Sequence, residues 1–255
     1  MTSAPARVLR PQHFLDTPDT ALVATDLLLE AQDTIRDTIE ARAIAVIYGD
    51  AGLGKTFAAR AALQETAPEL LLSLEFTRSR PGPGDLREAL FHQMGLPGPM
   101  PKTPSPMYRL LRTHLPRRPY VIVCDEAQQY RRQCFEFIRN LWDNCRKEDN
   151  RPAVLFIGGR EAYDTLQSDP ALASRIHIRQ EALAMSEEET LKTIPCYHPV
   201  WRETDPQLLK YIDKAHAAGV FRRWSNITQH VLTALHRLDK QHADQEAADW
   251  ALARC

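Results

Sequence analysis

The 255-residue chain has no long hydrophobic run and no excess of charge of either sign. A membrane-spanning helix needs about 20 consecutive apolar residues, and no stretch of this sequence approaches that length. The first ten residues also lack the apolar core of a signal peptide. We therefore expect a cytoplasmic protein with no membrane partner.

Paired cysteines and zinc-type spacings are absent as well. The five cysteines are scattered along the chain without a CxxC pair, and the nine histidines include no HExxH motif. This pattern favours reduced thiols, as in the cytoplasm, and disfavours a zinc site. The formal net charge of -1 excludes a polycation that coats nucleic acid through bulk charge, although a local basic face stays possible.

Hydrophobic periodicity divides the chain into two parts. Short apolar strand patterns alternate with helical ones as far as residue 178, which indicates an α/β domain with a mainly parallel sheet. We expect strands over residues 43–48, 70–76, 120–124, 154–157 and 176–178. We expect helices over 24–41, 56–65 and 107–115, one that begins at Asp85 and one that carries Tyr130, Cys134, Phe135, Ile138, Leu141 and Trp142. Beyond residue 181 only helical patterns follow, over 205–217, 221–238 and 241–253, with capping-box spacing at Ser186 and Glu189. The expected organisation is an N-terminal arm (1–20), an α/β nucleotide-binding domain (21–180) and a helical domain with a tail (181–255).

The strongest motif follows the first expected strand and matches the phosphate-loop pattern GxxxxGK[ST] in full. Its residues are Gly49, Asp50, Ala51, Gly52, Leu53, Gly54, Lys55 and Thr56. Glycines let the backbone curl so that its N–H groups point at phosphate oxygens, and the next helix presents its positive end. Lys55 would reach the β- and γ-phosphates, and the Thr56 hydroxyl would bind Mg²⁺. The motif predicts a site for ATP and Mg²⁺.

A second motif completes this expected site. The apolar run over residues 121–124 ends in the carboxylates of Asp125 and Glu126, about 70 residues after the phosphate loop. Parallel sheets carry ligand chemistry at the carboxyl ends of their strands. We expect Asp125 to hold the magnesium ion through its water, and Glu126 to orient or deprotonate the attacking water.

These motifs resemble those of the AAA+ ATPases, and more narrowly the bacterial transposition ATPases TniB, TnsC and MuB together with the ExeA-like secretion ATPases. The resemblance covers about residues 20–240 and rests on IAVIYGDAGLGKT, VIVCDEAQ and VLFIGGREAYDTLQSDPALASRI. It implies a P-loop NTPase (AAA+) fold, with a parallel sheet flanked by helices and a small C-terminal helical lid. The DEAQ tetrapeptide also occurs in helicases, but the later stretch differs and the chain has no room for two helicase motor domains.

The resemblance assigns roles to two arginines. Arg175 stands where these ATPases place an arginine finger, which reaches the nucleotide of a neighbouring subunit; the alternative is a surface arginine before a strand. Arg222 resembles the lid sensor that contacts the γ-phosphate, and the alternative is an exposed pair with Arg223. One departure concerns the position after the strand 154–157, where the family has a polar side chain and this sequence reads Gly158-Gly159-Arg160. Either Arg160 takes over that role or hydrolysis is slow.

The resemblance also implies the function of a transposition regulator. Such a protein assembles with ATP on duplex DNA, as a homo-oligomeric ring or helical filament, and recruits a transposase and in some cases a target-selection protein. Two expected loops carry residues suited to a phosphate backbone, Arg78 and Arg80 in the first and Lys102 and Thr103 in the second. The alternative for both is a solvated surface loop.

Two other functions stay open. An ExeA-like envelope or secretion ATPase would act on proteins, but such proteins continue into a membrane or wall-binding segment, and this sequence stops at Cys255 without one. A nucleotide-dependent scaffold or defence switch with little turnover is compatible with the two glycines at 158 and 159.

Overall fold

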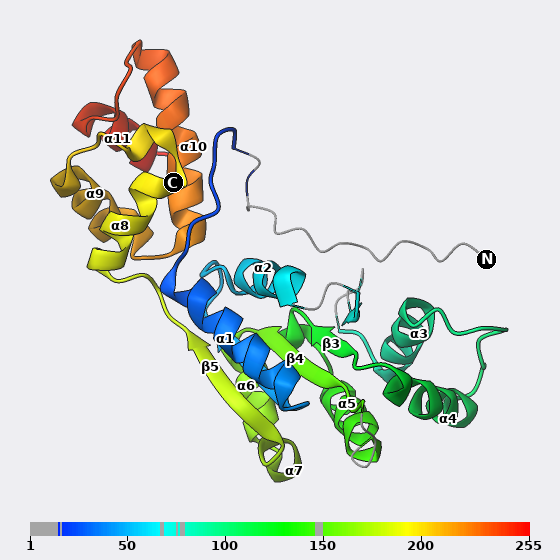
Figure 1. Ribbon diagram of the computed structural model, residues 1–255. Coiled ribbons are helices and arrows are strands. Elements are labelled where there is room, and N and C mark those ends of the chain that lie inside the picture. Colours follow the sequence, from blue (N-terminus) through cyan, green and yellow to red (C-terminus); the bar gives the residue numbers. More distant parts are fainter. Residues whose placement is uncertain (1–14, 16, 67–68, 75, 77–79, 146–149) are drawn as a thin grey trace.

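The computed structural model describes residues 15, 17–66, 69–74, 76, 80–145 and 150–255. They form an α/β region around a five-stranded sheet and a helical C-terminal region that stands at one end of it (Figure 1). Arg78, one of the two expected DNA contacts of the first loop, lies outside the described residues. Within the described ranges, no helix combines the length and the apolar character that a membrane crossing requires.

The sheet is parallel, with the strand order β2-β3-β4-β1-β5. The strands are β1 (Ile44–Gly49), β2 (Leu71–Ser73), β3 (Val121–Cys124), β4 (Ala153–Gly158) and β5 (Ile176–Ala182). Strands β1, β3 and β4 are buried along their whole length, as expected for parallel strands covered on both faces. Strand β4 lies between β1 and β3, and the three strands run parallel. The segments that follow them therefore lie side by side at the carboxyl end of the sheet.

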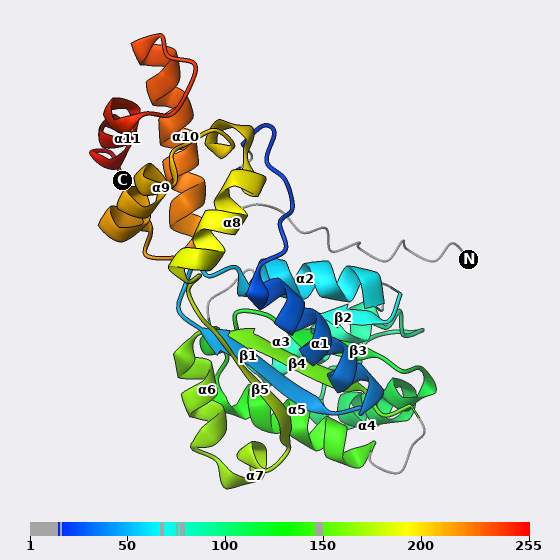
Figure 2. The same cartoon turned by 60° about the vertical axis from the view of Figure 1, so that its left-hand side comes forward.

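Helices cover both faces of the sheet (Figure 2). They are α1 (Asp26–Glu40), α2 (Lys55–Thr66), α3 (Pro83–Gln93), α4 (Pro104–His114), α5 (Arg132–Asn144), α6 (Arg160–Gln167) and α7 (Pro170–Ala173), with 3₁₀ turns at Leu115–Arg117 and Ala127–Gln129. Side chains of β1 alternate between the two layers: Val46 packs with α3 to α7, and Ala45 and Ile47 pack with α1 and α2. The α/β fold with its parallel sheet is therefore confirmed.

The C-terminal region has a hydrophobic core of its own. It contains α8 (Glu187–Tyr197), α9 (Pro206–Ile212), α10 (Phe221–Leu238) and α11 (Gln245–Leu252), with short turns at Pro199–Trp201 and Asp213–Ala217. Trp201 and Trp224 are fully buried and meet edge to face, with ring centroids 5.5 Å apart. The Ser186 side chain caps α8 by accepting the N–H of Glu189, as the spacing indicates.

The Glu189 carboxylate does not return to Ser186. It accepts the N–H of Asp26 at 2.8 Å, at the positive end of α1. A second contact comes from the segment before α1, where the Ala21 N–H donates to the Tyr197 carbonyl at 2.8 Å. The helical region is thus hydrogen-bonded to the start of α1 and to the segment before it. This contact lies near the carboxyl ends of the strands, where the site is expected.

Candidate active site

The phosphate loop connects β1 to α2, and two of its glycines are required by conformation and by space. Gly49 and Gly52 have φ values of +147° and +86°, which L-residues with side chains rarely adopt. A Cβ on Gly49 would lie 2.5 Å from the Ala182 carbonyl oxygen of β5, and one on Gly52 would lie 3.1 Å from both Val220 and Arg222. The loop is therefore packed between the sheet and the helical region.

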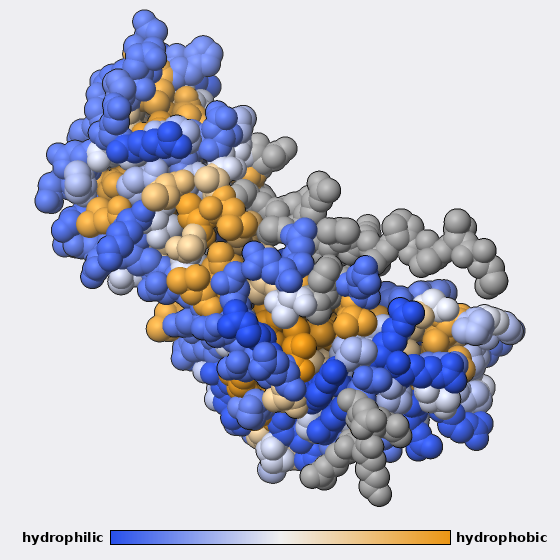
Figure 3. All heavy atoms as spheres, in the orientation of Figure 1, coloured by the Kyte–Doolittle hydropathy of each residue, from blue (hydrophilic) through white to orange (hydrophobic). Residues whose placement is uncertain are grey.

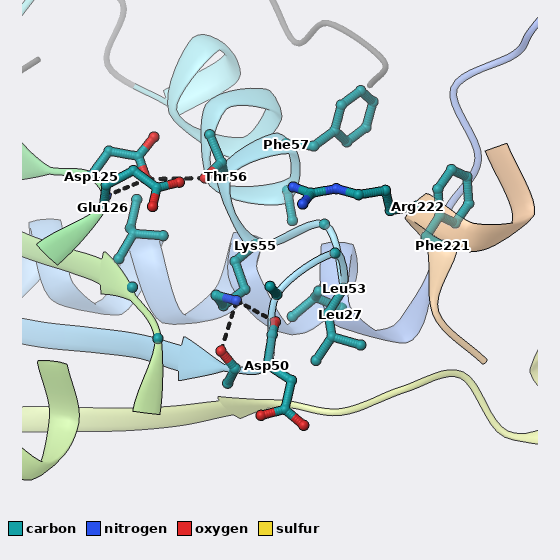
Figure 4. A pocket seen from close by; sticks show the side chains of 18 of the residues that line it. Leu27, Asp50, Leu53, Lys55, Thr56, Phe57, Asp125, Glu126, Phe221 and Arg222 are labelled. Atoms are coloured by element: carbon teal, nitrogen blue, oxygen red, sulfur yellow. Dashed lines mark hydrogen bonds between the residues drawn. The ribbon is translucent and has the colours of Figure 1, made fainter. Parts of the chain in front are cut away.

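Lys55 is buried beneath this loop. Its Nζ donates to the carbonyl oxygens of Gly49 at 2.9 Å and Asp50 at 2.6 Å (Figure 4). Burial lowers the pKa of Lys55, and the carboxylates of Glu126 and Asp50 oppose that shift. The ammonium group is thus held by two neutral carbonyl oxygens. A negatively charged phosphate oxygen forms a stronger hydrogen bond with an ammonium group and can displace them.

Thr56 and Asp125 meet at the opposite side of the cavity. The Thr56 hydroxyl donates to Asp125 Oδ1 at 3.0 Å, and the Glu126 N–H donates to the same oxygen at 2.9 Å. Arg60 of α2 lies 3.5 Å from Oδ2. Burial raises the pKa of Asp125, while the Glu126 N–H, the Thr56 hydroxyl and Arg60 act in the opposite direction.

This pair of oxygen ligands fits a magnesium ion. Mg²⁺ prefers hydroxyl, carboxylate and phosphate oxygens and is commonly held by one or two protein groups together with substrate phosphates. Among the described residues, no three His, Cys, Asp or Glu side chains gather in a way that could hold a metal by themselves. Thr56 and Asp125 would hold the ion jointly with the phosphates.

Glu126 follows Asp125 in a left-handed conformation, with φ 51° and ψ 40°. A non-glycine residue in this region carries backbone strain, which is often found at functional sites. Its carboxylate accepts a hydrogen bond from Gln128 Nε2, and Gln128 Oε1 accepts the Gly159 N–H at 2.8 Å. The sequence motifs do not single out Gln128 for a role, although it is the last residue of the DEAQ tetrapeptide.

Arg160 does not face this carboxylate. Its guanidinium pairs with the Glu181 carboxylate of β5, and Tyr48 Oη lies 3.5 Å from the same carboxylate. Burial raises the pKa of Tyr48, and the Glu181 charge adds to the shift. Arg160 thus borders the site while its charge is engaged at β5.

These groups surround a cavity of about 600 Å³ that is open to solvent. Its volume is within the range of about 300–1,000 Å³ that is typical of small-molecule sites. Apolar side chains from three segments line the other end: Val23, Leu27, Leu53, Phe57 and Phe221. Hydrophobic residues are visible on the surface where the helical region meets the α/β region (Figure 3). The cavity thus combines a polar end with an apolar one.

Arg222 brings the helical region into the cavity. Its backbone N–H donates to the Gly52 carbonyl at 3.0 Å, and its side chain extends from the start of α10 above the phosphate loop toward α2 (Figure 4). Arg223 points elsewhere, since its guanidinium donates to the His216 carbonyl at 3.1 Å.

Arg175 lies at the other end of β5 from the phosphate loop. Its Nε donates to both oxygens of Asp143 at 2.9 and 2.8 Å, and Nη1 donates to the Ala171 carbonyl at 2.8 Å. Residue 175 precedes Ile176, which pairs with Ile44 at the start of β1, whereas the cavity is at the carboxyl ends of the strands. Arg175 is not brought to the cavity of its own chain.

The expected DNA contacts precede α3 and α4, two helices that pack on the same face of the sheet. Arg80 is exposed, with φ 60°, just before α3. Lys102 and Thr103 are exposed at the start of α4. None of the three lines the nucleotide cavity.

The family model described as "AAA domain" matches residues 37–166, just over half of the chain. The chain belongs to the AAA domain family. It is accordingly an ATPase. A comparison with curated protein sequences finds no match.

Solved structures show the same fold at low sequence identity. The Aeropyrum pernix ORC2 protein, in its ADPNP-ADP complexes, is 14% identical with a TM-score of 0.68, over 93% of this AAA domain protein and 70% of ORC2. The A. pernix ORC1 protein in complex with DNA is 17% identical with a TM-score of 0.65, over 93% of this chain and 66% of ORC1. The Thermotoga maritima RuvB Holliday junction branch migration motor is 15% identical with a TM-score of 0.62, over 93% and 72%. At these identities the likeness shows the fold.

Proposed function

We propose that this AAA domain ATPase is a cytoplasmic transposition regulator that assembles with ATP on duplex DNA and there recruits or activates a transposase. The observation that carries the proposal is the separation of its cationic groups. Lys55 and Arg222 lie in the cavity, whereas Arg175 lies at the far end of β5, away from the cavity of its own chain. Such an arrangement suits an ATPase that becomes active on assembly.

The residues of the cavity suggest how ATP is bound and hydrolysed. The N–H groups of the phosphate loop and Lys55 would hold the β- and γ-phosphates, and Thr56 with Asp125 would hold Mg²⁺. A magnesium ion held there would supply positive charge that offsets the charge of the phosphates. Glu126 would take the proton of the attacking water, and Arg222 would contact the γ-phosphate from α10.

DNA binding is the second part of the proposal. Arg80, Lys102 and Thr103 are exposed on segments leading into α3 and α4, and such side chains suit phosphate contacts that carry no sequence preference. The net charge of -1 disfavours tight binding by one copy, but many copies could each add a small contribution along one duplex. The A. pernix ORC1 structure, which contains DNA, is of the same fold. The transposase partner is supported by the resemblance of the sequence to TniB, TnsC and MuB.

The test combines assembly with salt dependence. With a non-hydrolysable ATP analogue and duplex DNA, we expect DNA-bound rings or filaments by electron microscopy, and an affinity that falls steeply with salt. The double variant R80A/K102A should reduce both the affinity and the salt slope. The matched double variant R117A/R118A removes two exposed arginines of the turn after α4 and should change neither. Particles that are indifferent to DNA would contradict the proposal.

A scaffold or switch with little turnover is the second candidate. It is favoured by the end of β4, where Gly158 and Gly159 have no side chain and Arg160 is paired with Glu181. Single-turnover and steady-state ATPase rates separate the two, because a scaffold would show no stimulation by DNA or by assembly.

A further inference from the structure

Gln128 connects the ends of β3 and β4 at the wall of the cavity. It belongs to the 3₁₀ turn Ala127–Gln129 after β3, and its Oε1 accepts the Gly159 N–H, just beyond β4, at 2.8 Å. Its Nε2 donates to Glu126 Oε2. One amide group thus spans from the backbone after β4 to the carboxylate after β3.

The orientation of this amide follows from its partners. A backbone N–H can only donate, so the atom of Gln128 that faces Gly159 must be the oxygen. The NH₂ group is then directed at Glu126, whose ionised carboxylate can only accept. If the amide were reversed, its NH₂ group would face the Gly159 N–H and its oxygen would face the Glu126 carboxylate, and neither pair can form a hydrogen bond. The contact with Gly159 therefore fixes the NH₂ group as the part of Gln128 that faces Glu126.

Gly158, the last residue of β4, and Gly159 after it are matched to this side chain. A Cβ on Gly158 would lie 2.7 Å from Gln128 Oε1 and 3.2 Å from the Ala127 nitrogen. The space where a side chain would begin is therefore occupied by Gln128. Gly159 has an ordinary φ of -74°, and a Cβ there would meet only the movable end of Glu161 at 2.6 Å and Gln128 at 3.7 Å or more.

We propose that Gln128 is the positioning residue of this ATPase and replaces the polar side chain that is missing after β4. It holds Glu126 Oε2 by a donated hydrogen bond, so that Oε1 is left to face the attacking water. The proposal rests on the role of Glu126 proposed above. It accounts for both glycines, because the side chain that acts at this position comes from the turn after β3.

The first test separates turnover from binding. In Q128A, kcat should fall by about 10- to 100-fold, a part of the roughly 10²- to 10⁴-fold that a general base contributes. Affinity for a fluorescent ATP analogue and the melting temperature should stay near wild type, since Gln128 is exposed and does not belong to the phosphate loop. Q129A alters the same residue type one position further along the turn and should retain full turnover. A Q128A protein with wild-type or increased kcat would overturn the proposal.

The second test uses charge and rescue. In Q128E a carboxylate replaces the amide, so the side chain loses the NH₂ group that donates to Glu126, and kcat should fall at least as far as in Q128A. In the double variant Q128A/G159N, an asparagine after β4 should recover at least part of the lost kcat, because the amide returns from the other strand. A wild-type kcat in Q128E, or no recovery of kcat in Q128A/G159N, would overturn the proposal.

E126Q is measured in parallel to keep the two proposals apart. If E126Q hydrolyses ATP at the wild-type rate, the role of Glu126 fails and the positioning role falls with it. If E126Q is inactive while Q128A is fully active, only the inference about Gln128 is overturned.

Discussion

The backbone N–H of Arg222 donates to the carbonyl oxygen of Gly52 at 3.0 Å, which joins the first turn of α10 to the phosphate loop. A second close contact supports this one: the Met185 N–H donates to the Gly219 carbonyl at 3.0 Å, and a Cβ on Gly219 would lie 2.2 Å from the Met185 oxygen. The segment leading into α10 is thus held on both sides. A change in the phosphate loop on nucleotide binding is expected to move α10 with it.

The substitution G52A tests this connection. An added Cβ would press on Val220 and Arg222 at 3.1 Å, so α10 should be displaced and ATP affinity should fall by about tenfold or more. The matched control is G98A, because Gly98 has a φ of +85°, close to the +86° of Gly52, but no atom of the described residues within 4 Å of where its Cβ would lie. Both variants carry the backbone cost of about 1 kcal/mol or more, but only G52A should lose ATP binding and expose the helical region to limited proteolysis. Equal ATP affinities in the two variants would refute the connection.

The side chain of Arg222 is tested separately from its backbone. In R222A the N–H to Gly52 remains, so folding and the position of α10 should be kept, while the charge above the phosphate loop is lost. We expect kcat to fall by about 10- to 100-fold, because a positioned cation offsets charge that develops on the phosphates. R223A removes the neighbouring arginine, which bonds the His216 carbonyl, and should keep at least half of the activity. If the two variants lose activity equally, Arg222 has no special role.

Periodicity predicts most of the elements, and the exceptions have physical causes. The predicted bounds of α10, residues 221–238, are confirmed, because its apolar face repeats over five turns. Strand β5 is predicted over 176–178 but extends to Ala182, since it is an edge strand paired only with β1 and tolerates Arg179, Gln180 and Glu181. Helices α6 and α7 are not predicted; they are short and bury few residues each.

The motifs of the site can be predicted, but the contacts between them cannot. Residues 49–56 and 125–126 are contiguous in sequence, so the chemistry of each motif is visible in its own residues. The bond from Gln128 to Gly159 depends on β4 lying beside β3, and the bond from Arg222 to Gly52 depends on how the helical region returns to the loop. Neither the order of the strands in the sheet nor the position of α10 can be predicted from a short stretch of sequence.

The raised pKa of Asp125 predicts that its ionised carboxylate, which is needed for hydrolysis, lowers the stability of the folded protein. Burial disfavours its ionised form, so the folded pKa is above the unfolded value. As the pH rises from the pKa of Asp125 in the unfolded chain to its higher pKa in the folded protein, the folded protein loses stability. At neutral pH, above both pKa values, this loss is complete. D125N keeps an oxygen for Thr56 and Glu126 but cannot ionise.

We therefore expect D125N to melt at or above the wild-type temperature at neutral pH without nucleotide, and to lose Mg²⁺-dependent hydrolysis by about 100-fold or more. A gain of 1 kcal/mol corresponds to about 2–4 °C in a chain of this size. The difference between the two melting temperatures should shrink as the pH is lowered through the raised pKa. Thermal melts from pH 4 to 8 provide the measurement, and a difference that is independent of pH would disprove the burial penalty.

The ion pair between Arg175 and Asp143 distinguishes a structural arginine from one that acts on a neighbour. Both side chains are about one-third exposed, at 33% and 28%, so the pair itself is expected to contribute no more than about 1 kcal/mol to stability. R175A and D143A both break the pair, but only R175A removes the guanidinium. If Arg175 reaches the nucleotide of a second copy, R175A should lose about 10²-fold or more in ATPase activity while D143A retains most of it.

Mixing completes this test. R175A protein keeps a complete cavity but lacks the arginine, whereas K55A protein keeps the arginine but lacks the phosphate-binding lysine. In a mixed assembly, Arg175 of the K55A copies can serve the cavities of the R175A copies, so activity should reappear from two inactive proteins. The ATPase rate is measured against the mixing ratio, with a maximum expected at intermediate ratios. If the mixture stays inactive and D143A is as impaired as R175A, the arginine acts only within its own chain, by holding α5 to the start of β5.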